Sequence, residues 1–216
     1  MKMVKIYLFT RFERIWHWVQ MLLIFMLIIT GFEVHGFYTL FGFESAVKLH
    51  NFLGITWCIL VVFIIFWMLI TAEWKQYIPT TQKLFEVAKY YLFGIFQGKE
   101  HPIHQTRESK HNPLQRLIYL GLISSVLPVQ IVTGLLYWTY NDWQGWGLTG
   151  FLDLQIVATI HFIIAVYLIH FIIIHVYMTT TGHTPTAHIK AMFSGYEEIP
   201  EDTPVAVWAI KKPKNV

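Results

Sequence analysis

Four long apolar segments constrain the fold of this chain more than any other feature of its sequence. They cover residues 15–34, 50–71, 117–138 and 154–178. A helix needs about 20 apolar residues to cross the hydrocarbon core of a bilayer, and each segment is long enough. Only 13% of the residues are charged, against about 25% in soluble proteins. The chain is therefore predicted to be an all-α membrane protein built as a four-helix transmembrane bundle.

Basic residues lie almost entirely in one set of connecting segments. Of the 16 lysine and arginine residues, Lys48 alone lies between the first and second spans or between the third and fourth. Segments rich in lysine and arginine tend to stay on the cytoplasmic side of a membrane. This distribution predicts that both termini are cytoplasmic, and we expect a multi-pass protein of the bacterial inner membrane. It also accounts for the net charge of +3 without a nucleic-acid partner.

The two longest polar segments differ in character. Residues 72–112 form a predicted cytoplasmic loop, in which apolar positions between Leu84 and Phe96 recur with helical spacing. This spacing predicts an amphipathic helix on the membrane surface, with a loose loop as the alternative. Residues 183–216 form a polar, proline-containing cytoplasmic tail with no sign of a second domain.

The sequence contains one cysteine, Cys58, within the second span. A single cysteine excludes a disulfide framework, a thiolate zinc cage, covalent haem attachment through CxxCH, and an iron–sulfur cluster held by this chain alone. The 11 histidines are more informative, because ionisable side chains inside membrane spans are rare and mark functional sites.

The last span carries three histidines, His161, His170 and His175. His161 and His175 are 14 residues apart, so at about 100° per residue they share one helix face and lie about 21 Å apart along the axis. His170 is half a turn out of phase and points elsewhere. The last span therefore offers two candidate ligands at two depths of the membrane.

Two other spans supply a histidine at each of these depths. His17 lies near the cytoplasmic end of the first span, at the depth of His175, and His50 begins the second span at the depth of His161. We predict the cross-helix pairs His17 with His175 and His50 with His161, each suited to hold a haem iron between two neutral imidazoles. His35, on the same face of the first span as His17, is the alternative outer ligand to His50.

Small residues near these histidines provide room for a porphyrin, or else allow close helix packing. They are Gly31, Gly54, Gly121 and Gly134. The remaining histidines fall in polar segments and are expected to be solvated: His101, His104, His111, His183 and His188.

Five motifs follow one another along the chain. They are R-x-x-H-W at Arg14–Trp18, T-G at Thr30–Gly31, H-x-x-x-G at His50–Gly54, K-H-N-P-L-Q-R at Lys110–Arg116, and the histidine pair of the last span. In this order on four spans they resemble the di-haem cytochrome b membrane subunits of Ni-Fe hydrogenases, thiosulfate reductases and formate dehydrogenases. The resemblance covers about residues 10–180 and implies that residues 1–182 form one four-span cytochrome b domain.

The resemblance also implies cofactors. The matching histidines of the family ligate an inner and an outer haem b: His17, His50, His161 and His175. A quinone, menaquinone or ubiquinone, binds near the inner haem in that family, and the family's N-x-x-Q falls on Asn112 and Gln115. The alternative role of Asn112 is to cap the helix that begins at Pro113.

The resemblance finally implies a partner. The ending T-T-T-G-H-T-P at Thr179–Pro185 resembles stand-alone members encoded beside multihaem c-type cytochromes or other periplasmic redox subunits. The long cytoplasmic loop and the four rather than five spans depart from the hydrogenase type. We therefore expect an electron-transfer subunit of a quinone-linked respiratory oxidoreductase complex. Its periplasmic partner, a multihaem cytochrome c or an iron–sulfur or molybdopterin subunit, would carry the substrate catalysis.

Two other functions are compatible with the same spans. A haem-free membrane anchor would hold a periplasmic partner through the aromatic outer loop 140–150, which contains Trp143 and Trp146. A small transporter or proton channel would use the histidines of the last span as a relay. The phase of His170 argues against the relay, because a relay needs its histidines on one face.

Overall fold

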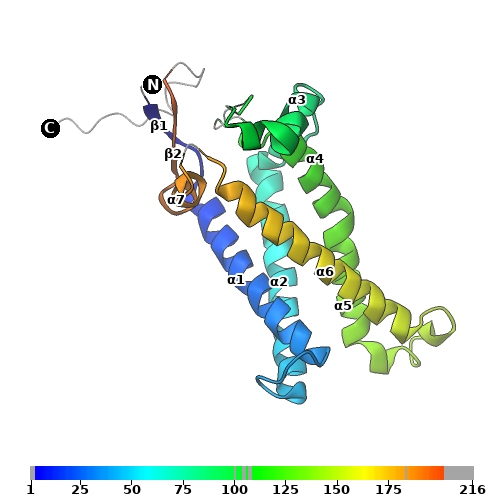
Figure 1. The fold of residues 1–216 in the computed structure, drawn as a ribbon. Coiled ribbons are helices and arrows are strands. Elements are labelled where there is room, and N and C mark those ends of the chain that lie inside the picture. The colour runs from blue at the N-terminus through cyan, green and yellow to red at the C-terminus, as the bar shows by residue number, and fades with distance from the viewer. Residues whose placement is uncertain (1–2, 100, 104–105, 107–108, 183, 202–216) are drawn as a thin grey trace. The chain divides into compact units, whose positions relative to one another are not determined.

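The computed structural model describes residues 3–99, 101–103, 106, 109–182 and 184–201. Among these residues, the helices long and apolar enough to cross a membrane are Arg11–Val34, Phe43–Thr71, Pro113–Trp138 and Leu154–Thr179 (Figure 1). The predicted all-α membrane architecture with four spans is thus confirmed. The first three spans begin earlier than predicted, because their first turns contain polar residues that lower the local hydropathy.

The chain divides into two compact units by packing. The first, which we call the helical unit, comprises Trp16–Ile70 and Leu122–Ile172. The second, which we call the polar unit, comprises the described parts of Met1–Ile15, Thr71–Gly121 and Ile173–Val216.

The helical unit holds most of the membrane-spanning residues. Its helices are α1 (Arg11–Val34), α2 (Phe43–Thr71), α5 (Leu127–Trp138) and α6 (Leu154–Thr179), with a π-helical turn at Leu122–Val126 and 3₁₀ turns at Tyr140–Asp142 and Leu148–Gly150. Large apolar side chains such as Phe25, Phe66 and Ile163 are more than half exposed on the outside of these helices. Helices that are apolar on all sides are typical of membrane spans.

Glu33 fixes the loop between α1 and α2. One of its carboxylate oxygens accepts hydrogen bonds from the backbone N–H groups of Leu40, Phe41 and Gly42, at 2.7 to 2.8 Å. Gly42 has a φ of 84°, which glycine adopts without the steric penalty of a Cβ atom. The start of α2 at Phe43, and with it the position of His50, is therefore set by this loop.

The polar unit contains a small sheet that the sequence analysis did not predict. Strand β1 (Met3–Tyr7) pairs antiparallel with β2 (Tyr196–Pro200), with Tyr7 opposite Tyr196. A core of Ile6, Leu8 and Ile199 lies at this sheet. Helix α7 (Ala187–Ser194) precedes β2. The polar tail thus folds back onto the N-terminal segment.

Gly195 joins α7 to β2. Its φ is 85°, and an added Cβ atom would lie 2.8 Å from the carbonyl oxygen of Phe9. That carbonyl belongs to the N-terminal segment, whose Leu8 and Phe9 N–H groups both donate to the carbonyl oxygen of Gly195. Only glycine fits this turn.

Residues 84–97 form a continuous helical segment rather than a loose loop. It consists of α3 (Leu84–Lys89), a π-helical turn at Tyr90–Gly94 and a 3₁₀ turn at Ile95–Gln97. Val87, Tyr90 and Gly94 are buried, whereas Phe85 and Phe96 are 85% and 76% exposed. The helical spacing of this segment is confirmed, and its predicted position on the membrane surface stays a prediction.

A buried ion cluster connects three segments of the polar unit. The Lys110 ammonium, only 2% exposed, pairs with Glu13 near the start of α1 and with Glu73 at 2.8 Å. Glu73 begins a 3₁₀ turn at Glu73–Tyr77, and Lys110 lies just before α4 (Pro113–Gly121). Because each buried charge has an opposite charge beside it, the desolvation penalty of burial is offset within the cluster.

Candidate functional site

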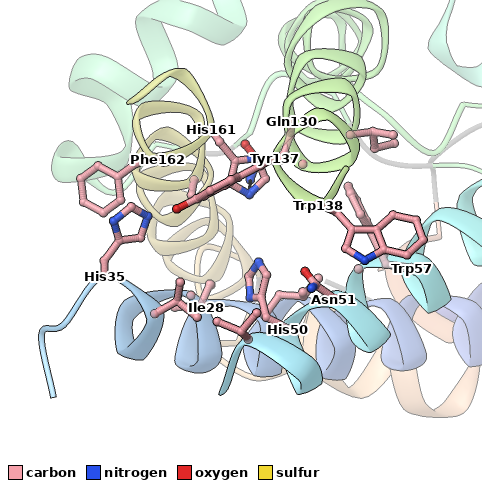
Figure 2. Close-up of a pocket in the computed structure, with 18 of the residues that line it drawn as sticks. Ile28, His35, His50, Asn51, Trp57, Gln130, Tyr137, Trp138, His161 and Phe162 are labelled. Atoms are coloured by element: carbon pink, nitrogen blue, oxygen red, sulfur yellow. Dashed lines mark hydrogen bonds between the residues drawn. The ribbon is translucent and has the colours of Figure 1, made fainter. Parts of the chain in front are cut away.

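A cavity of about 570 Å³ lies within the helical unit, and its volume falls in the range of small-molecule and cofactor sites. All four helices of the unit line it, mostly with apolar side chains. His50 from α2 and His161 from α6 project into it from facing helices (Figure 2). The cavity therefore combines an apolar wall with two imidazoles.

His50 and His161 lie at a distance that suits a shared metal ion. Their ring centroids are 6.4 Å apart and their ring planes are inclined by 81°. Metal–imidazole bonds are about 2.0 Å long, and each centroid lies about 1.2 Å behind the ligating nitrogen, so two imidazoles on one metal ion have centroids about 6.4 Å apart. The measured separation fits this requirement, and the predicted pairing of His50 with His161 is compatible with the structure.

Thr30 determines which nitrogen of His50 carries the proton. Its hydroxyl oxygen lies 2.9 Å from Nδ1 of His50 and 2.9 Å from the carbonyl oxygen of Met26. A hydroxyl has one hydrogen and a carbonyl can only accept. The hydroxyl therefore donates to Met26 and accepts a hydrogen bond from Nδ1–H of His50. In a neutral imidazole this leaves the lone pair on Nε2, the atom available to a metal.

Thr133 holds His161 in the same way. Its hydroxyl donates to the carbonyl oxygen of Val129 at 2.7 Å and lies 3.0 Å from Nδ1 of His161, which donates to it. The side-chain amide of Gln130 lies 3.2 Å from Nε2 of His161. Because Nδ1 is the donor, Nε2 accepts from this amide. Both histidines thus present an Nε2 lone pair.

Two glycines provide the space in which these imidazoles lie. A Cβ atom at Gly31 would lie 3.2 Å from Cε1 of His50, and one at Gly134 would lie 3.0 Å from Cε1 of His161. These glycines were expected to provide room for a porphyrin or to allow close helix packing. In the structure the space beside them is occupied by the histidine rings. An added Cβ at Gly54 or Gly121 meets no atom within 4 Å, and Gly54 lines the cavity.

Two further histidines of the helical unit, His35 and His170, have surroundings that differ from those of His50 and His161. The His35 ring packs against Phe162, with centroids 4.6 Å apart, and partial burial lowers the pKa of His35. His170 is exposed, and its Nδ1 bonds the carbonyl oxygen of Val166 one turn earlier on α6. The prediction that His170 points away from His161 is confirmed.

The predicted inner pair is divided between the two units. His17 belongs to the helical unit, where its ring packs edge-on against Trp18, and His175 belongs to the polar unit. The pairing of His17 with His175 stays a prediction.

Asn112 and Gln115 form a reciprocal cap at the start of α4. The Gln115 N–H donates to Oδ1 of Asn112 at 2.9 Å, and the Asn112 N–H donates to Oε1 of Gln115 at 3.0 Å. The Asn112 side-chain amide also donates to the hydroxyl of Tyr91, whose pKa burial raises to about 12. The alternative capping role of Asn112 is thus observed, and the quinone role of both residues stays a prediction.

The prediction that the remaining histidines are solvated is wrong for His101, His111 and His188. His111 packs between Tyr77 and Tyr119, and burial, together with Lys110 and Arg116, lowers its pKa to about 4. The His101 ring bonds the hydroxyl of Tyr91 and packs against Tyr90. His188 pairs with buried Glu197 at 2.8 Å. Polar sequence surroundings did not reveal these contacts. His104 and His183 lie outside the described residues.

Thr30 and Thr133 are the site residues whose role the sequence analysis missed. The available signal was the T-G dipeptide, which occurs at Thr30–Gly31 and again at Thr133–Gly134. In each case the threonine bonds a histidine and the glycine makes room for the same ring.

Comparison with known proteins agrees with this site. The family model of prokaryotic cytochrome b561 matches residues 8–195. A protein of Escherichia coli (strain K12) named "Putative cytochrome YdhU" is 35% identical over 202 residues, which cover 89% of this chain and 74% of that protein. The chain belongs to the prokaryotic cytochrome b561 family of membrane electron-transfer proteins, whose cofactor is haem b.

Proposed function

We propose that this chain is a di-haem cytochrome b that passes electrons between a quinone on the cytoplasmic side and a redox protein on the periplasmic side. The observation that carries the proposal is the His50–His161 pair. Its ring separation suits one iron, and both Nε2 atoms lie at the cavity, where ligation of His161 would replace its hydrogen bond with the Gln130 amide. A haem-free anchor would have no use for two imidazoles in the same tautomer at one apolar cavity.

Each residue of the pair has a defined task in this proposal. Bound between His50 and His161, haem b supplies one-electron chemistry. The two imidazoles would hold the iron, and the apolar lining would limit access of water to it, which affects the redox potential. His17 and His175 are proposed as the ligands of the inner haem.

The quinone site is proposed in the polar unit, near the start of α4. Asn112 and Tyr91 form a polar pair there, with a hydrogen bond of 3.0 Å between the asparagine amide and the tyrosine hydroxyl. A quinone carbonyl requires a hydrogen-bond donor, which this pair supplies when the bond between them opens. Gln115 supports Asn112 through the reciprocal cap.

The proposed orientation follows from the chain's path and charge. Four spans return the chain to the side on which it began, and the basic segments favour the cytoplasmic side of a bacterial inner membrane as that side. The partner would then meet the outer loops, where the Trp143 ring is buried and donates to the carbonyl of Leu136, while Trp146 is 57% exposed. Exposed tryptophan is frequent at protein interfaces.

Haem content per purified chain tests the proposal. We expect about two haems b in the wild type by pyridine haemochrome and difference spectra, and about one in His50→Ala or His161→Ala, because each variant removes one axial ligand. The double variant His50→Ala/His161→Ala should also keep about one, since both residues serve one haem. His17→Ala/His50→Ala should keep none.

Matched variants separate the alternatives. His170→Ala is the control, because this exposed ring bonds its own helix, and it should keep both haems. Loss of a haem in His35→Ala, with retention in His50→Ala, would move the outer ligand to His35. A folded wild-type chain without haem would overturn the proposal and favour the membrane anchor.

A further inference from the structure

Thr30 and Thr133 occupy equivalent places beside the two cavity histidines, one on α1 and the other on α5. They are 0% and 7% exposed. Each donates its hydroxyl hydrogen to the carbonyl oxygen four residues earlier and accepts a hydrogen bond from Nδ1 of a histidine on another helix. The same local arrangement thus occurs twice, once for each imidazole of the pair.

We propose that Thr30 and Thr133 are positioning residues that set the redox potential of the haem held by His50 and His161. The inference rests on the proposed function and deepens it. Each threonine holds its histidine in the tautomer whose lone pair is on Nε2. Its hydroxyl oxygen also attracts the Nδ1 proton through the hydrogen bond between them. Partners of the non-ligating nitrogen are known to orient a metal-bound imidazole and to raise its basicity. A more basic imidazole stabilises ferric over ferrous iron.

The backbone reinforces this arrangement. Each threonine hydroxyl also lies near a second carbonyl of its own helix, that of Leu27 at 3.3 Å from Thr30 and that of Gln130 at 3.2 Å from Thr133. A carbonyl can only accept, so both carbonyls of the preceding turn attract the hydroxyl hydrogen. The hydroxyl oxygen is therefore left to accept from Nδ1–H of the histidine.

The neighbouring glycines restrict the ring positions. Each ring lies so close to its glycine that an added Cβ atom would approach Cε1 to 3.0 to 3.2 Å. The ring contacts the helix that carries its threonine at two successive positions. Both the rotation and the tautomer of the imidazole are thereby determined before iron binds, which is the condition for a preorganised site.

A helical threonine without a histidine provides the matched control. Thr56 of α2 donates to the carbonyl oxygen of Phe52 at 2.8 Å and is half-buried. It shares the local helix bond of Thr30 and Thr133 and lies in the same unit. Replacing it by valine removes a helix hydroxyl but no contact to an imidazole.

Redox titration of the purified, haem-loaded protein tests the proposal. In Thr30→Val and in Thr133→Val we expect about two haems per chain, with the ferric-to-ferrous balance of one haem shifted about tenfold toward ferrous. For a one-electron couple this is a rise of about 59 mV. The other haem should keep its potential. Thr56→Val should match the wild type.

The conservative variants show whether the hydroxyl is responsible. Thr30→Ser and Thr133→Ser keep an acceptor for Nδ1–H and should restore the wild-type potential. If a valine variant does not accumulate, Thr→Cys at the same position serves instead, because a thiol is a weak acceptor. The low-spin EPR signal of the ferric haem gives an independent measure, since it depends on the angle between the two ring planes, 81° here.

The outcomes distinguish this inference from the proposed function. Two haems in the valine variants with unchanged potentials and EPR signals would overturn the positioning role and leave the di-haem proposal intact. A shift in the serine variants as large as in the valine variants would also overturn it, because packing rather than the hydroxyl would be responsible. A wild-type chain without haem would overturn both.

Discussion

The helical unit and the polar unit bury polar side chains by opposite means. In the polar unit the charged side chains form ion pairs: buried Lys110 pairs with Glu13 and Glu73, and half-buried His188 pairs with buried Glu197. In the helical unit His50 and His161 are satisfied on Nδ1 by neutral hydroxyls, and their Nε2 atoms lie at a cavity.

This difference separates buried polar groups that stabilise the fold from buried polar groups that a ligand can use. An ion pair has its partner within the chain and needs no ligand. The Nε2 atoms at the cavity differ, because that of His161 is held only by the neutral amide of Gln130 at 3.2 Å, a hydrogen bond that ligation of a metal would replace. The number of histidines in the sequence does not reveal which of them serve which purpose. The hydrogen-bond partner of each ring nitrogen does reveal it.

The largest expected effect concerns the buried ion cluster of the polar unit and its contribution to stability. Lys110→Met leaves Glu13 and Glu73 facing each other, 12% and 17% exposed and without their shared cation. Breaking a buried pair by removing one partner costs about 3 to 5 kcal/mol. We expect a loss of this size in the free energy of unfolding, measured by circular dichroism of the protein in detergent.

An exposed ion pair supplies the control for Lys110. Lys48 and Glu44 form an i,i+4 pair with side chains 74% and 83% exposed, and such pairs contribute less than about 1 kcal/mol. Lys48→Met should therefore have little effect on unfolding. Equal effects of the two variants would mean that the polar unit does not depend on its buried cluster. At temperatures where Lys110→Met is folded, it should keep the haem of the His50–His161 pair.

The second prediction concerns the helical unit. Gly134→Ala introduces a Cβ atom 3.0 Å from Cε1 of His161, and overpacking of this kind costs about 1 to 3 kcal/mol. We expect the ring to shift away from Thr133, with partial loss of one haem per chain by pyridine haemochrome. Gly31→Ala should have a smaller effect, because the same contact is 3.2 Å at His50.

Gly121→Ala is the control for this pair. Its added Cβ atom meets nothing within 4 Å, and alanine in place of a helical glycine is neutral or stabilising where space allows. Haem content should stay at the wild-type value. If Gly134→Ala also keeps full haem content and potential, the glycines serve helix packing rather than ring placement.

The sequence predicted those features of the helical unit that depend on regular spacing. The four spans follow from hydropathy, and the juxtaposition of His50 with His161 follows from their matching depth on the second and fourth spans, which cross the membrane in the same direction. The threonine contacts could not be predicted, because a helical threonine ordinarily bonds its own preceding turn, as Thr56 does. The contact of Thr30 or Thr133 to a histidine depends on the rotation of the helix that carries that histidine.

The polar unit was less predictable for a related reason. The β1–β2 pairing joins segments near opposite ends of the chain, and no periodic pattern reports such a contact. The Lys110 cluster joins residues from three separate segments, and its members look like ordinary surface charges in the sequence. Hydropathy identifies what enters the membrane, but not which charges become buried beside it.

The third prediction separates the two roles of Asn112. Asn112→Ala removes the cap of α4, and loss of an N-cap costs about 0.5 to 2 kcal/mol. Asn112→Asp keeps an oxygen for the Gln115 N–H, so stability should recover. The aspartate cannot donate to Tyr91 or to a quinone carbonyl. We therefore expect slow haem reduction by quinol in both variants. If Asn112→Asp recovers the rate of quinol oxidation as well as the stability, the quinone role of Asn112 is contradicted.

The smallest expected effect is a pH dependence confined to the polar unit. Its hydrogen bond with Glu197 raises the pKa of His188 above the usual value of 6.5. A raised pKa in the folded state stabilises folding fully below the unfolded pKa, and this contribution is lost as pH rises through the folded pKa. Thermal unfolding of the wild type should thus show a small stability advantage over Glu197→Gln at about pH 6, which fades toward about pH 9. An advantage that grows as pH rises would contradict the ion pair. The haem potentials of the helical unit should not follow this titration, because its histidines are held by neutral hydroxyls.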